Sequence, residues 1–516
     1  MYRLAELLRH YVKGRPDNLC IAYEDENISF AELDQRSDRL AAALLGQGLA
    51  SGDRVAILAT NKPVFFELLF ACAKSGLIML PINWRLSARE ISGIIADAGP
   101  RCIFADEEFV DNLPPCAEFG DFKLIALGES FNQWRDRNSG DTSSDLAADR
   151  TLVRDADSTV MLLYTSGTTG LPKGAMVSDR NISFHQRHGR EMWGFSEASV
   201  NLVAMPLFHI GGIGYGLNAM LAGGATVILQ QADPQQLCQA IVRYKVTHSF
   251  FVPAVIQMLA ELPGIDSKDM SSLEFIGYGA SPISETLLKR ALKIFQCGFA
   301  HAYGLTESCG TVITLLPEFH DPEASNKERL RSCGRPVPWA EVALFEPQSM
   351  TQVATGEVGE ICIRSGMTVK GYWNKPEATA DTITADGWLR TGDAAYCDDD
   401  GFFYIHDRYK DMIVSGGENI YPTEIENILY EYPDVAEAAV IGVPHPRWGE
   451  TPKAIIVSTP GVLIEIEALM EFIRSRLARY KCPTSIEFVE VMPRNASGKI
   501  LKRELRAMTW PEPDMP

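Results

Sequence analysis

Short apolar runs alternate with segments of helical period along residues 53–335. Apolar runs that alternate with amphipathic helical patterns are typical of βαβ units, in which helices cover a parallel sheet. The pattern therefore predicts an α/β protein whose large domain contains two parallel-type sheet subdomains. The expected strands are Val55–Leu58, Ile78–Leu80, Cys102–Phe104, Ala225–Leu229, Ser249–Val252 and Phe275–Ile276, and the expected helices are Phe65–Ala73, Ile91–Ala98, Leu237–Tyr244 and Leu287–Phe295.

The pattern of apolar and turn-forming residues changes after about Arg335. Short apolar runs and Gly/Asp turns there predict a small β-rich subdomain at residues 335–407. A separate α+β module begins near Pro422. We therefore expect an N-terminal domain of residues 1–407 and a smaller C-terminal domain of residues 412–516. Expected helices in the module are Thr423–Glu431 and Glu465–Tyr480, and expected strands are Ala438–Val443, Ala454–Val457 and Ile486–Val491.

Two further stretches bear on the boundaries of the fold. Residues 1–12 place Leu4, Leu7, Leu8 and Tyr11 on one helical face, which indicates a docking helix and not a signal peptide. Residues 120–157 turn polar and irregular, so a variable surface loop is expected there. No apolar run approaches the roughly 20 residues that a transmembrane helix needs.

Length and composition narrow the function classes. A chain of 516 residues is too long for one ordinary core, and 46 % hydrophobic with 22 % charged residues is ordinary globular material. A net charge of −19 argues against nucleic acid as the main partner. The eleven cysteines are scattered without a C-x-x-C pair, which suits reduced thiols and gives no zinc framework. We expect a soluble, cytoplasmic protein.

A loop rich in glycine and hydroxyl residues, YTSGTTGLPKG, occupies Tyr164–Gly174 after the apolar run Thr159–Leu163. Glycine lets several backbone N–H groups approach one anion, and Ser/Thr hydroxyls and a lysine add donors. The G-x-x-x-x-G-K-S/T spacing of a P-loop is absent. A flexible turn is the alternative, but the residue types favour a phosphate-binding loop.

Further motifs follow in order: PLFH at 206–209, YGLTE at 303–307, TGD at 391–393 with DRYKD at 407–411, and PRNASGK at 493–499. With the loop, they make nearly the whole chain resemble the adenylate-forming superfamily, and within it the acyl-CoA synthetases that include fatty-acyl-CoA and aryl-CoA ligases. The resemblance implies ATP-dependent formation of an acyl-adenylate from a medium-chain, long-chain or aryl acid. Transfer to coenzyme A would follow, with release of AMP and pyrophosphate. The implied cofactors are ATP, Mg²⁺ and coenzyme A.

The resemblance also implies roles for residues around the triphosphate. Glu307 would ligate Mg²⁺, which prefers oxygen ligands and bridges phosphates, and Thr306 would donate to the α-phosphate. Taken alone, a Thr-Glu pair is more often a helix cap. The β- and γ-phosphates would be held by Thr165, Ser166, Gly167, Thr168, Thr169, Gly170 and Lys173.

The adenosine contacts are implied in the same way. Tyr303 would offer an aromatic face to adenine, and Gly279, Ala280 and Ser281 would line the other side. Asp393 would accept hydrogen bonds from the ribose hydroxyls with help from Arg408. The residues by themselves leave structural alternatives open, because the segment at 279–282 also fits a strand-to-helix turn and Asp393 fits a Gly-containing turn.

By resemblance, the C-terminal domain is mobile about a hinge at residues 408–411, centred on Lys410. Lys499 would bridge carboxylate and α-phosphate oxygens during adenylation; the alternative is an exposed lysine that opens a helix at Ile500–Met508. Gly416 and Gly417 would line a tunnel for the pantetheine arm, although Gly-Gly is equally a plain turn.

His209 would gate the acyl pocket or approach the substrate carboxylate, with a core histidine as the competing interpretation. The glycines of 211–214 are expected to leave volume for a medium or long acyl chain or an aryl acid. The sequence does not identify the acid, because one methylene is worth only about 1–3 kcal/mol in such a pocket.

Other functions are compatible with parts of this pattern. The first alternative is an acyl-AMP synthetase that loads a separate acyl carrier protein, although this chain has no attached carrier domain. A luciferase-like oxygenase on the same fold is a further alternative, which the sequence does little to exclude. A non-catalytic nucleotide-binding protein is disfavoured by the joint presence of Lys173, Glu307, Asp393, Arg408 and Lys499. Peripheral membrane contact and a homodimer stay open.

Overall fold

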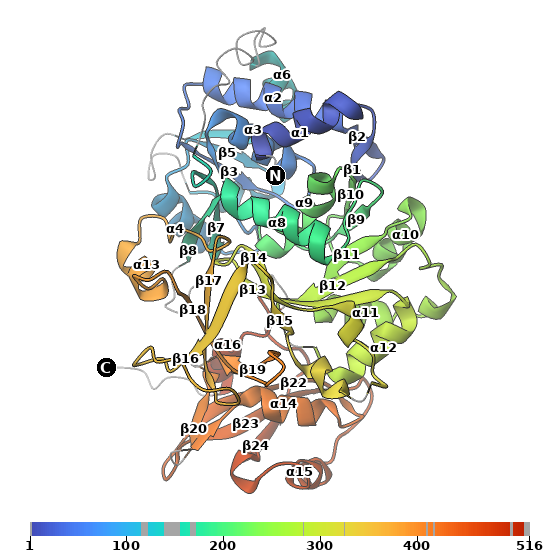
Figure 1. Cartoon of the computed structure of the whole chain (residues 1–516), viewed down its shortest axis with the longest axis vertical. Coiled ribbons are helices and arrows are strands. Elements are labelled where there is room, and N and C mark those ends of the chain that lie inside the picture. Colours follow the sequence, from blue (N-terminus) through green and yellow to red (C-terminus); the bar gives the residue numbers. More distant parts are fainter. Residues whose placement is uncertain are drawn as a thin grey trace.

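The computed structural model describes residues 3–114, 122–138, 155–165, 172–281, 283–324, 326–408, 411–415, 418–495 and 499–509. Within these ranges the chain forms four sheets with helices packed against them (Figure 1). Two sheets are large and mainly parallel, and the two smaller ones are mainly antiparallel. The predicted α/β class, with two parallel-type sheets in the large part of the chain, is confirmed.

The first large sheet has the strand order β6-β5-β3-β4-β7-β8, and every pair in it is parallel except β7 with β8. Alternate residues of β3 point into two separate cores, because successive side chains leave a strand on opposite faces. Val55 packs into the core beneath α2 and α3, whereas Ala56 packs into the core beneath α4. The strands are β3 Arg54–Leu58, β4 Ile78–Pro81, β5 Cys102–Ala105, β6 Lys123–Ala126, β7 Thr159–Thr165 and β8 Lys173–Ser178.

The second large sheet has the order β15-β14-β13-β12-β11-β9-β10-β1-β2 within the described ranges. The inner strands from β13 to β1 run parallel, and antiparallel strands are added at both edges. The strands are β1 Leu19–Tyr23, β2 Glu26–Ser29, β9 Val200–Val203, β10 Ala225–Ile228, β11 His248–Phe251, β12 Phe275–Gly279, β13 Gly298–Leu305, β14 Gly310–Leu315 and β15 Arg335–Pro336.

The two smaller sheets belong to the last third of the chain, and Figure 1 shows the C-terminal module in orange to red at the lower end of the view. One sheet has the order β16-β17-β18-β19, and the other has β21-β20-β23-β22 with β24 beside β23. The strands are β16 Ala340–Phe345, β17 Gly359–Ser365, β18 Leu389–Cys397, β19 Phe403–Arg408, β20 Ile413–Ser415, β21 Glu418–Ile420, β22 Val435–His445, β23 Gly449–Ser458 and β24 Ser485–Phe488.

Helices cover these sheets and supply most of the apolar side chains of the cores. Among the described residues, no helix is both long enough and apolar enough to span a bilayer. The helices are α1 Leu4–Gly14, α2 Phe30–Gly46, α3 Val64–Ser75, α4 Ala88–Ala98, α6 Glu129–Asn138, α8 Asp179–Met192, α9 Ile210–Ala222, α10 Pro234–Tyr244, α11 Pro253–Ala260, α12 Glu285–Phe295, α13 Pro376–Thr382, α14 Pro422–Tyr430, α15 Ile466–Arg474 and α16 Lys502–Thr509.

The predicted N-terminal docking helix is confirmed, because α1 buries Leu4, Leu7, Leu8 and Tyr11. The expectation of a loop throughout residues 120–157 is wrong, because this stretch contains β6 and α6. The helix α6 is polar in sequence, but it buries Phe131, and its Arg135 guanidinium donates to the buried Glu67 carboxylate at 3.0 Å. A tertiary ion pair thus stabilises a helix that hydrophobic periodicity does not reveal.

Two predicted helices of the C-terminal module have different bounds. The helix expected at Glu465–Tyr480 ends at Arg474, after which Arg479–Lys481 forms a separate 3₁₀ turn. The helix expected at Ile500–Met508 begins at Lys502, because Ile500 pairs with Arg494 in an isolated β-bridge.

Candidate active site

The sequence motifs lie where parallel strands end. The strand β7 ends at Thr165, β9 ends shortly before 206–209, and β12 ends at Gly279. The strand β13 ends at Leu305, within the YGLTE motif. Open parallel sheets bind ligands beyond the carboxyl ends of their strands, so these strand ends, one in the first large sheet and three in the second, mark the candidate active site.

The YGLTE motif forms a tight hairpin between β13 and β14, and Thr306 and Glu307 lie in its turn. A Cβ at Gly304 would lie 1.8 Å from the Gly310 carbonyl oxygen, so only glycine permits this crossing. The Ser308 hydroxyl accepts from the Leu305 N–H at 2.9 Å and donates to the Gly310 carbonyl at 2.8 Å. The helix-cap alternative for Thr306-Glu307 is therefore wrong, because the two residues are presented by a strand-to-strand turn.

Tyr372 joins the hairpin turn to the glycine-rich loop. Its hydroxyl donates to Glu307 Oε1 at 2.6 Å, and Lys173 Nζ lies 5.2 Å from its ring centroid. The Trp373 N–H donates to the Gly174 carbonyl at 2.8 Å, which fixes the Tyr372 segment beside β8. Burial and the Glu307 carboxylate raise the pKa of Tyr372, so its hydroxyl remains a donor. A cation and a carboxylate are thus held around one phenol.

These residues fit a site for Mg²⁺-bound phosphates. Within the described ranges, no cluster of three or more His, Cys, Asp or Glu side chains is arranged to hold a metal ion by itself. Mg²⁺ is commonly held by one or two carboxylates together with substrate phosphate oxygens, and the Glu307 carboxylate is of the type that could take this role. Lys173 supplies a positive charge on the neighbouring strand β8.

Tyr303 and Asp393 are brought together from β13 and β18. The Tyr303 hydroxyl donates to Asp393 Oδ2 at 2.8 Å, and both residues are buried. Burial and the nearby Asp393 carboxylate raise the pKa of Tyr303 well above its usual value. Asp393 lies opposite Arg408 in the register of β18 and β19. Two residues predicted to contact adenosine are therefore hydrogen-bonded to each other.

The segment Gly279–Ser281 leaves β12 toward α12 in a strained turn. A Cβ at Gly279 would lie 2.1 Å from the Ala302 carbonyl oxygen. Ala280 has φ of +64°, which is uncommon for a residue with a side chain, and such strain clusters at ligand sites. The strand-to-turn geometry predicted as the structural alternative is present, and the contact with adenosine stays a prediction.

His209 stands immediately before α9, and its backbone N–H donates to the Pro206 carbonyl at 3.1 Å. Burial, reinforced by the Arg85 charge, lowers the pKa of His209 to about 4, so the imidazole is neutral near pH 7. Among the described residues, none provides a hydrogen-bond partner for its buried Nε2. Core histidines such as His188 also have buried ring nitrogens without a partner among the described residues, so the pocket role of His209 stays a prediction.

Asn61 is a positioning residue that sequence reasoning missed. Its Nδ2 donates to the carbonyls of Met205 at 3.0 Å and Leu229 at 3.1 Å, and its Oδ1 accepts from the Leu207 N–H at 2.9 Å. These contacts hold the backbone of the PLFH segment in front of His209. Tyr372 was missed as well. Its only signal in the sequence is an aromatic pair after Gly371, and nothing local connects it to Glu307.

Several predicted site residues lie outside the described residues. They are Ser166, Gly167, Thr168, Thr169, Gly170, Lys410, Gly416 and Gly417, together with the side chain of Arg408. Lys499 is described: its N–H donates to Asn495 Oδ1 at 2.8 Å, and its carbonyl accepts from the Asn495 N–H at 2.8 Å. Because α16 starts at Lys502, Lys499 lies on a loop and does not open the helix.

The expectation that the glycines near His209 leave free volume is mostly wrong. A Cβ at Gly212 would lie 2.0 Å from the Pro206 carbonyl oxygen, and one at Gly214 would lie 2.9 Å from His185 Cε1. A Cβ at Gly216 would lie 2.8 Å from Phe66 Cζ. These glycines permit close packing of α9. Gly211 differs, because a Cβ there would make only an ordinary contact of 3.7 Å with Phe250 Cε1.

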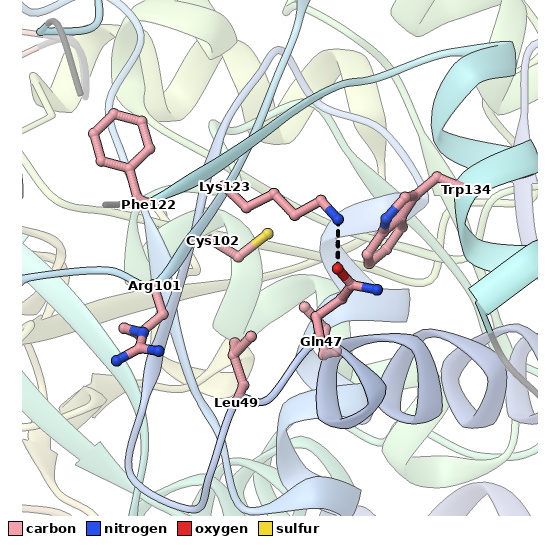
Figure 2. Close-up of a pocket in the computed structure, with 8 residues that line it drawn as sticks. Gln47, Leu49, Arg101, Cys102, Phe122, Lys123 and Trp134 are labelled. Carbon is pink, nitrogen blue, oxygen red and sulfur yellow. Dashed lines mark hydrogen bonds between the residues drawn. The ribbon is translucent and has the colours of Figure 1, made fainter. Parts of the chain in front are cut away.

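A separate hollow of about 280 Å³ lies between the end of α2, the strands β5 and β6, and α6 (Figure 2). Lys123 Nζ donates to Gln47 Oε1 across it at 2.5 Å. None of the motif residues lines this hollow, so it is distinct from the candidate active site. Its lining residues are Leu44, Gln47, Leu49, Arg101, Cys102, Phe122, Lys123 and Trp134.

Comparison with known proteins adds two family matches. The sequence model of the AMP-binding enzyme family matches residues 8–373, and that of the AMP-binding enzyme C-terminal domain matches residues 424–499. The chain is 38 % identical to a fatty acid–acyl-carrier-protein ligase of Streptomyces coeruleorubidus, over 98 % of this chain and 96 % of the relative. It is 39 % identical to a feruloyl-CoA synthase of an Amycolatopsis species, over 95 % of this chain and 96 % of the relative.

The fold is also similar to solved structures. The o-succinylbenzoate CoA synthetase of Bacillus subtilis, in complex with ATP and a magnesium ion, superimposes with a TM-score of 0.82 at 30 % identity, covering 97 % of this chain and 99 % of that chain. MatB of Rhodopseudomonas palustris with bound ATP gives a TM-score of 0.88 at 28 % identity, covering 98 % of both chains.

Proposed function

The chain belongs to the AMP-binding enzyme family of adenylate-forming enzymes, and we propose that it is an ATP-dependent acid–CoA ligase. It would form an acyl-adenylate from a carboxylic acid and then pass the acyl group to the thiol of coenzyme A. The observation that supports this most is the Lys173–Tyr372–Glu307 group, which sets a cation and a carboxylate around one phenol at the strand ends. Relatives that are named CoA ligases or synthetases over nearly the whole chain agree with it.

In the first half-reaction a carboxylate oxygen attacks the α-phosphorus, and the bond to the pyrophosphate oxygen breaks. Lys173 would neutralise charge on the departing pyrophosphate, and Thr306 would donate to an α-phosphate oxygen as charge develops there. Glu307 would hold Mg²⁺, which screens the phosphate charges when it is bound. The neutral His209 would orient the substrate carboxylate through its buried Nε2 without adding a second positive charge.

The nucleoside would be held at the junction of the second large sheet with the β16–β19 sheet. Tyr303 would present its ring to adenine while its hydroxyl holds one oxygen of Asp393, which leaves the other oxygen for the ribose hydroxyls. The strained turn at Gly279–Ser281 would close the opposite side.

The second half-reaction would use another face of the C-terminal domain, residues 412–516. This domain would turn about a hinge at 408–411, so that Lys499 serves adenylation and Gly416 and Gly417 line the path of the pantetheine arm. Such a division fits a family in which one conformational step separates two reactions. We also place the reaction in the cytoplasm, on the basis of the scattered cysteines and the absence of any long apolar run in the sequence.

Pyrophosphate release tests this function. Purified protein with ATP and Mg²⁺ is assayed against straight-chain, branched and aryl acids, each with and without coenzyme A. We expect acid-dependent release that becomes multiple-turnover when coenzyme A is present, with one mole of acyl-CoA per mole of pyrophosphate. Release without any acid dependence contradicts the proposal.

A carrier protein as the acyl acceptor is the second candidate, because one relative of 38 % identity is named a fatty acid–acyl-carrier-protein ligase. The same assay separates the two acceptors. In one outcome, release stops after one pyrophosphate per enzyme molecule although coenzyme A is present, and it resumes when a phosphopantetheinylated carrier protein is added. The acceptor is then a carrier protein.

Replacing Tyr303 by phenylalanine is expected to lower kcat/KM for ATP about 10–100-fold, because a hydrogen bond to a charged group is worth about 1.5–3 kcal/mol. The ring is retained, so stacking on adenine is kept while Asp393 loses the donor that orients it. ATP–pyrophosphate exchange at saturating acid measures the effect. A matched control is Tyr404→Phe, which removes a hydroxyl bonded to Asp398 on the same sheet, away from Asp393. Equal losses in both variants would contradict a specific role for the Tyr303–Asp393 pair.

A further inference from the structure

Asp97 is the penultimate residue of α4 and lies where a carboxylate is locally unfavourable. The carbonyl groups at the end of a helix carry a partial negative charge, so this end favours a cation over an anion. Within the described helix, the last turn contains no basic residue. The Asp97 side chain is nevertheless only 16 % exposed. A residue that departs from a local preference in this way is expected to have its role in the tertiary structure.

Two side chains converge on the Asp97 carboxylate. The Tyr164 hydroxyl donates to Oδ2 at 2.7 Å, and Lys375 Nζ donates to Oδ1 at 2.7 Å. Burial and the Asp97 carboxylate raise the pKa of Tyr164, so its hydroxyl remains a donor. We call Asp97 with Tyr164 and Lys375 the α4 junction, and the two hydrogen bonds are its two arms. The elements that the arms join, β7 and the segment before α13, lie beside α4 (Figure 1).

The Tyr164 arm reaches the base of the glycine-rich loop. In the ladder of β7 with β8, Tyr164 lies opposite Gly174, and Thr165 lies opposite Lys173. A Cβ at Gly174 would lie 2.8 Å from Tyr164 Cε2, so the ring packs against the backbone of β8. Tyr164 is thus held at its ring by β8 and at its hydroxyl by Asp97. The two strand ends from which the loop departs therefore rest on α4.

The Lys375 arm reaches the segment that carries Tyr372. The Lys375 N–H donates to the Tyr372 carbonyl at 3.3 Å, so both residues belong to one turn. Asn374, between them, has φ of +52°, and its Nδ2 donates to the Asp97 carbonyl at 3.1 Å. Positive φ is uncommon outside glycine but is tolerated by asparagine. Asp97 therefore fixes the turn whose Tyr372 hydroxyl donates to Glu307.

The end of α4 is also held without Asp97. Arg54 Nε donates to the Ala98 carbonyl at 2.6 Å, and Nη2 donates to the Gly99 carbonyl at 2.8 Å. The same guanidinium lies 5.2 Å from the Trp373 ring centroid. Arg54 thus supplies the cation that the end of α4 favours. Removal of the Asp97 carboxylate should therefore leave the helix end in place and break only the two arms.

We propose that Asp97 is a positioning residue for the triphosphate of ATP. Through one arm it sets the base of the loop that presents Lys173, and through the other it sets the segment that carries Tyr372 beside Glu307. Both arms thus lead to groups that act on the pyrophosphate half of the nucleotide, where small displacements of aligning groups are costly. This inference rests on the proposed function, because it adds a residue to the same site.

The test compares the affinities of ATP and AMP, each with Mg²⁺ and without acid, by titration calorimetry. Asp97→Ala is expected to weaken ATP binding at least about tenfold, the effect of one hydrogen bond to a charged group. AMP lacks the β- and γ-phosphates and is expected to keep its affinity. In pyrophosphate release, KM for ATP is expected to rise while KM for the acid stays unchanged. A purely structural loss would reduce the fraction of folded enzyme and leave the ratio of the two affinities unchanged.

Separate variants test the two arms. Tyr164→Phe keeps the ring against Gly174 and loses only the bond to Asp97, and Lys375→Met removes the other arm. Each is expected to weaken ATP binding less than Asp97→Ala does. Adding Tyr164→Phe to Asp97→Ala is expected to cause no further loss, because the partner of the hydroxyl is already absent.

Asp34→Ala is the matched control. The Asp34 side chain is likewise 16 % exposed, and its carboxylate pairs with Lys74, which joins α2 to α3. This variant is expected to keep the wild-type ratio of ATP to AMP affinity. Thermal unfolding of every variant shows whether it is folded.

A folded Asp97→Ala enzyme with the wild-type ratio of affinities overturns the inference, and so does an equal change of that ratio in Asp34→Ala. If Asp97→Ala does not fold, a folded Tyr164→Phe enzyme with the wild-type ratio overturns it. In these cases the wild-type enzyme still releases pyrophosphate with acid, and the proposed function stands. A wild-type enzyme that binds neither nucleotide contradicts the proposed function itself.

Discussion

Lys499→Ala is expected to abolish acyl-adenylate formation while thioester formation from supplied acyl-AMP proceeds at close to the wild-type rate. An ammonium that bridges carboxylate and α-phosphate oxygens stabilises charge that develops only in the adenylation transition state. Removing one such donor typically lowers the rate about 10²–10³-fold. Once the adenylate exists, that charge has already left with pyrophosphate. The two rates are measured separately, by ATP–pyrophosphate exchange and by acyl-CoA formation from synthetic acyl-AMP.

The position of Lys499 makes this test clean. Its backbone is fixed by the paired hydrogen bonds with Asn495, and neither bond uses the lysine side chain. Truncation at Cβ keeps both of these hydrogen bonds. Arg503→Ala is the matched control, because it removes an exposed cation from the nearby helix α16. If Lys499→Ala lowers the rates of both half-reactions equally, the proposal that different faces of the C-terminal domain serve the two half-reactions is contradicted.

Acidification is expected to destabilise the protein steeply as the pH falls below 6.5. Burial lowers the pKa of His185 to about 4, of His188 to about 3 and of His320 to about 4. Unfolding restores the ordinary value of about 6.5, so the unfolded chain binds more protons below that pH. The stability that these neutral histidines provide is complete above pH 6.5. It is lost progressively as the pH falls toward 4 and 3.

The size of this effect is large compared with the net stability of a domain. Each histidine contributes about 1.4 kcal/mol per pH unit within its window, or about 2 kcal/mol between pH 6.5 and pH 5. Three such groups together approach the free energy of unfolding of an ordinary domain, about 5–15 kcal/mol. Denaturant unfolding at a series of pH values between 5 and 8 measures the slope.

His188 provides the sharpest variant for this test. Its side chain is 2 % exposed, and within the described part of the chain neither ring nitrogen has a hydrogen-bond partner. It meets the rings of Trp193 and Trp339 edge-on, contacts that phenylalanine can also make. His188→Phe is expected to flatten the slope by about 1.4 kcal/mol per pH unit. His10→Phe, at an exposed position, is the control, and equal slopes in the two variants would contradict the assignment.

Periodicity and motifs together predicted most of this architecture, and the reasons differ between elements. The alternation of apolar runs and helices located β3, β4 and β5, because strands buried on both faces are continuously apolar. The motifs singled out Tyr303, Glu307 and Asp393 through resemblance to a family, and Gly304 in the first motif is at a position that has no room for a Cβ. Periodicity failed at α6, where the Arg135–Glu67 ion pair stabilises a polar helix.

Residues whose partners are distant in sequence could not be found in this way. Tyr372 acquires its role by bonding to Glu307, which precedes it by 65 residues. The glycines of α9 show a related difficulty. A glycine in a sequence indicates either free space or a close neighbour, and Gly214 has His185 where free volume was expected. The direction in which such a position opens depends on α8, which packs against it in the tertiary structure.

The side-chain amide of Asn61 also links the two large sheets. It follows β3 of the first large sheet, yet it is bonded to backbone groups beyond β9 and β10 of the second. Relative sliding of the two sheets would stretch three hydrogen bonds at once and shift the loop that precedes His209. This seam is therefore stiff, and the motion that the two proposed half-reactions need would come from the proposed hinge at residues 408–411.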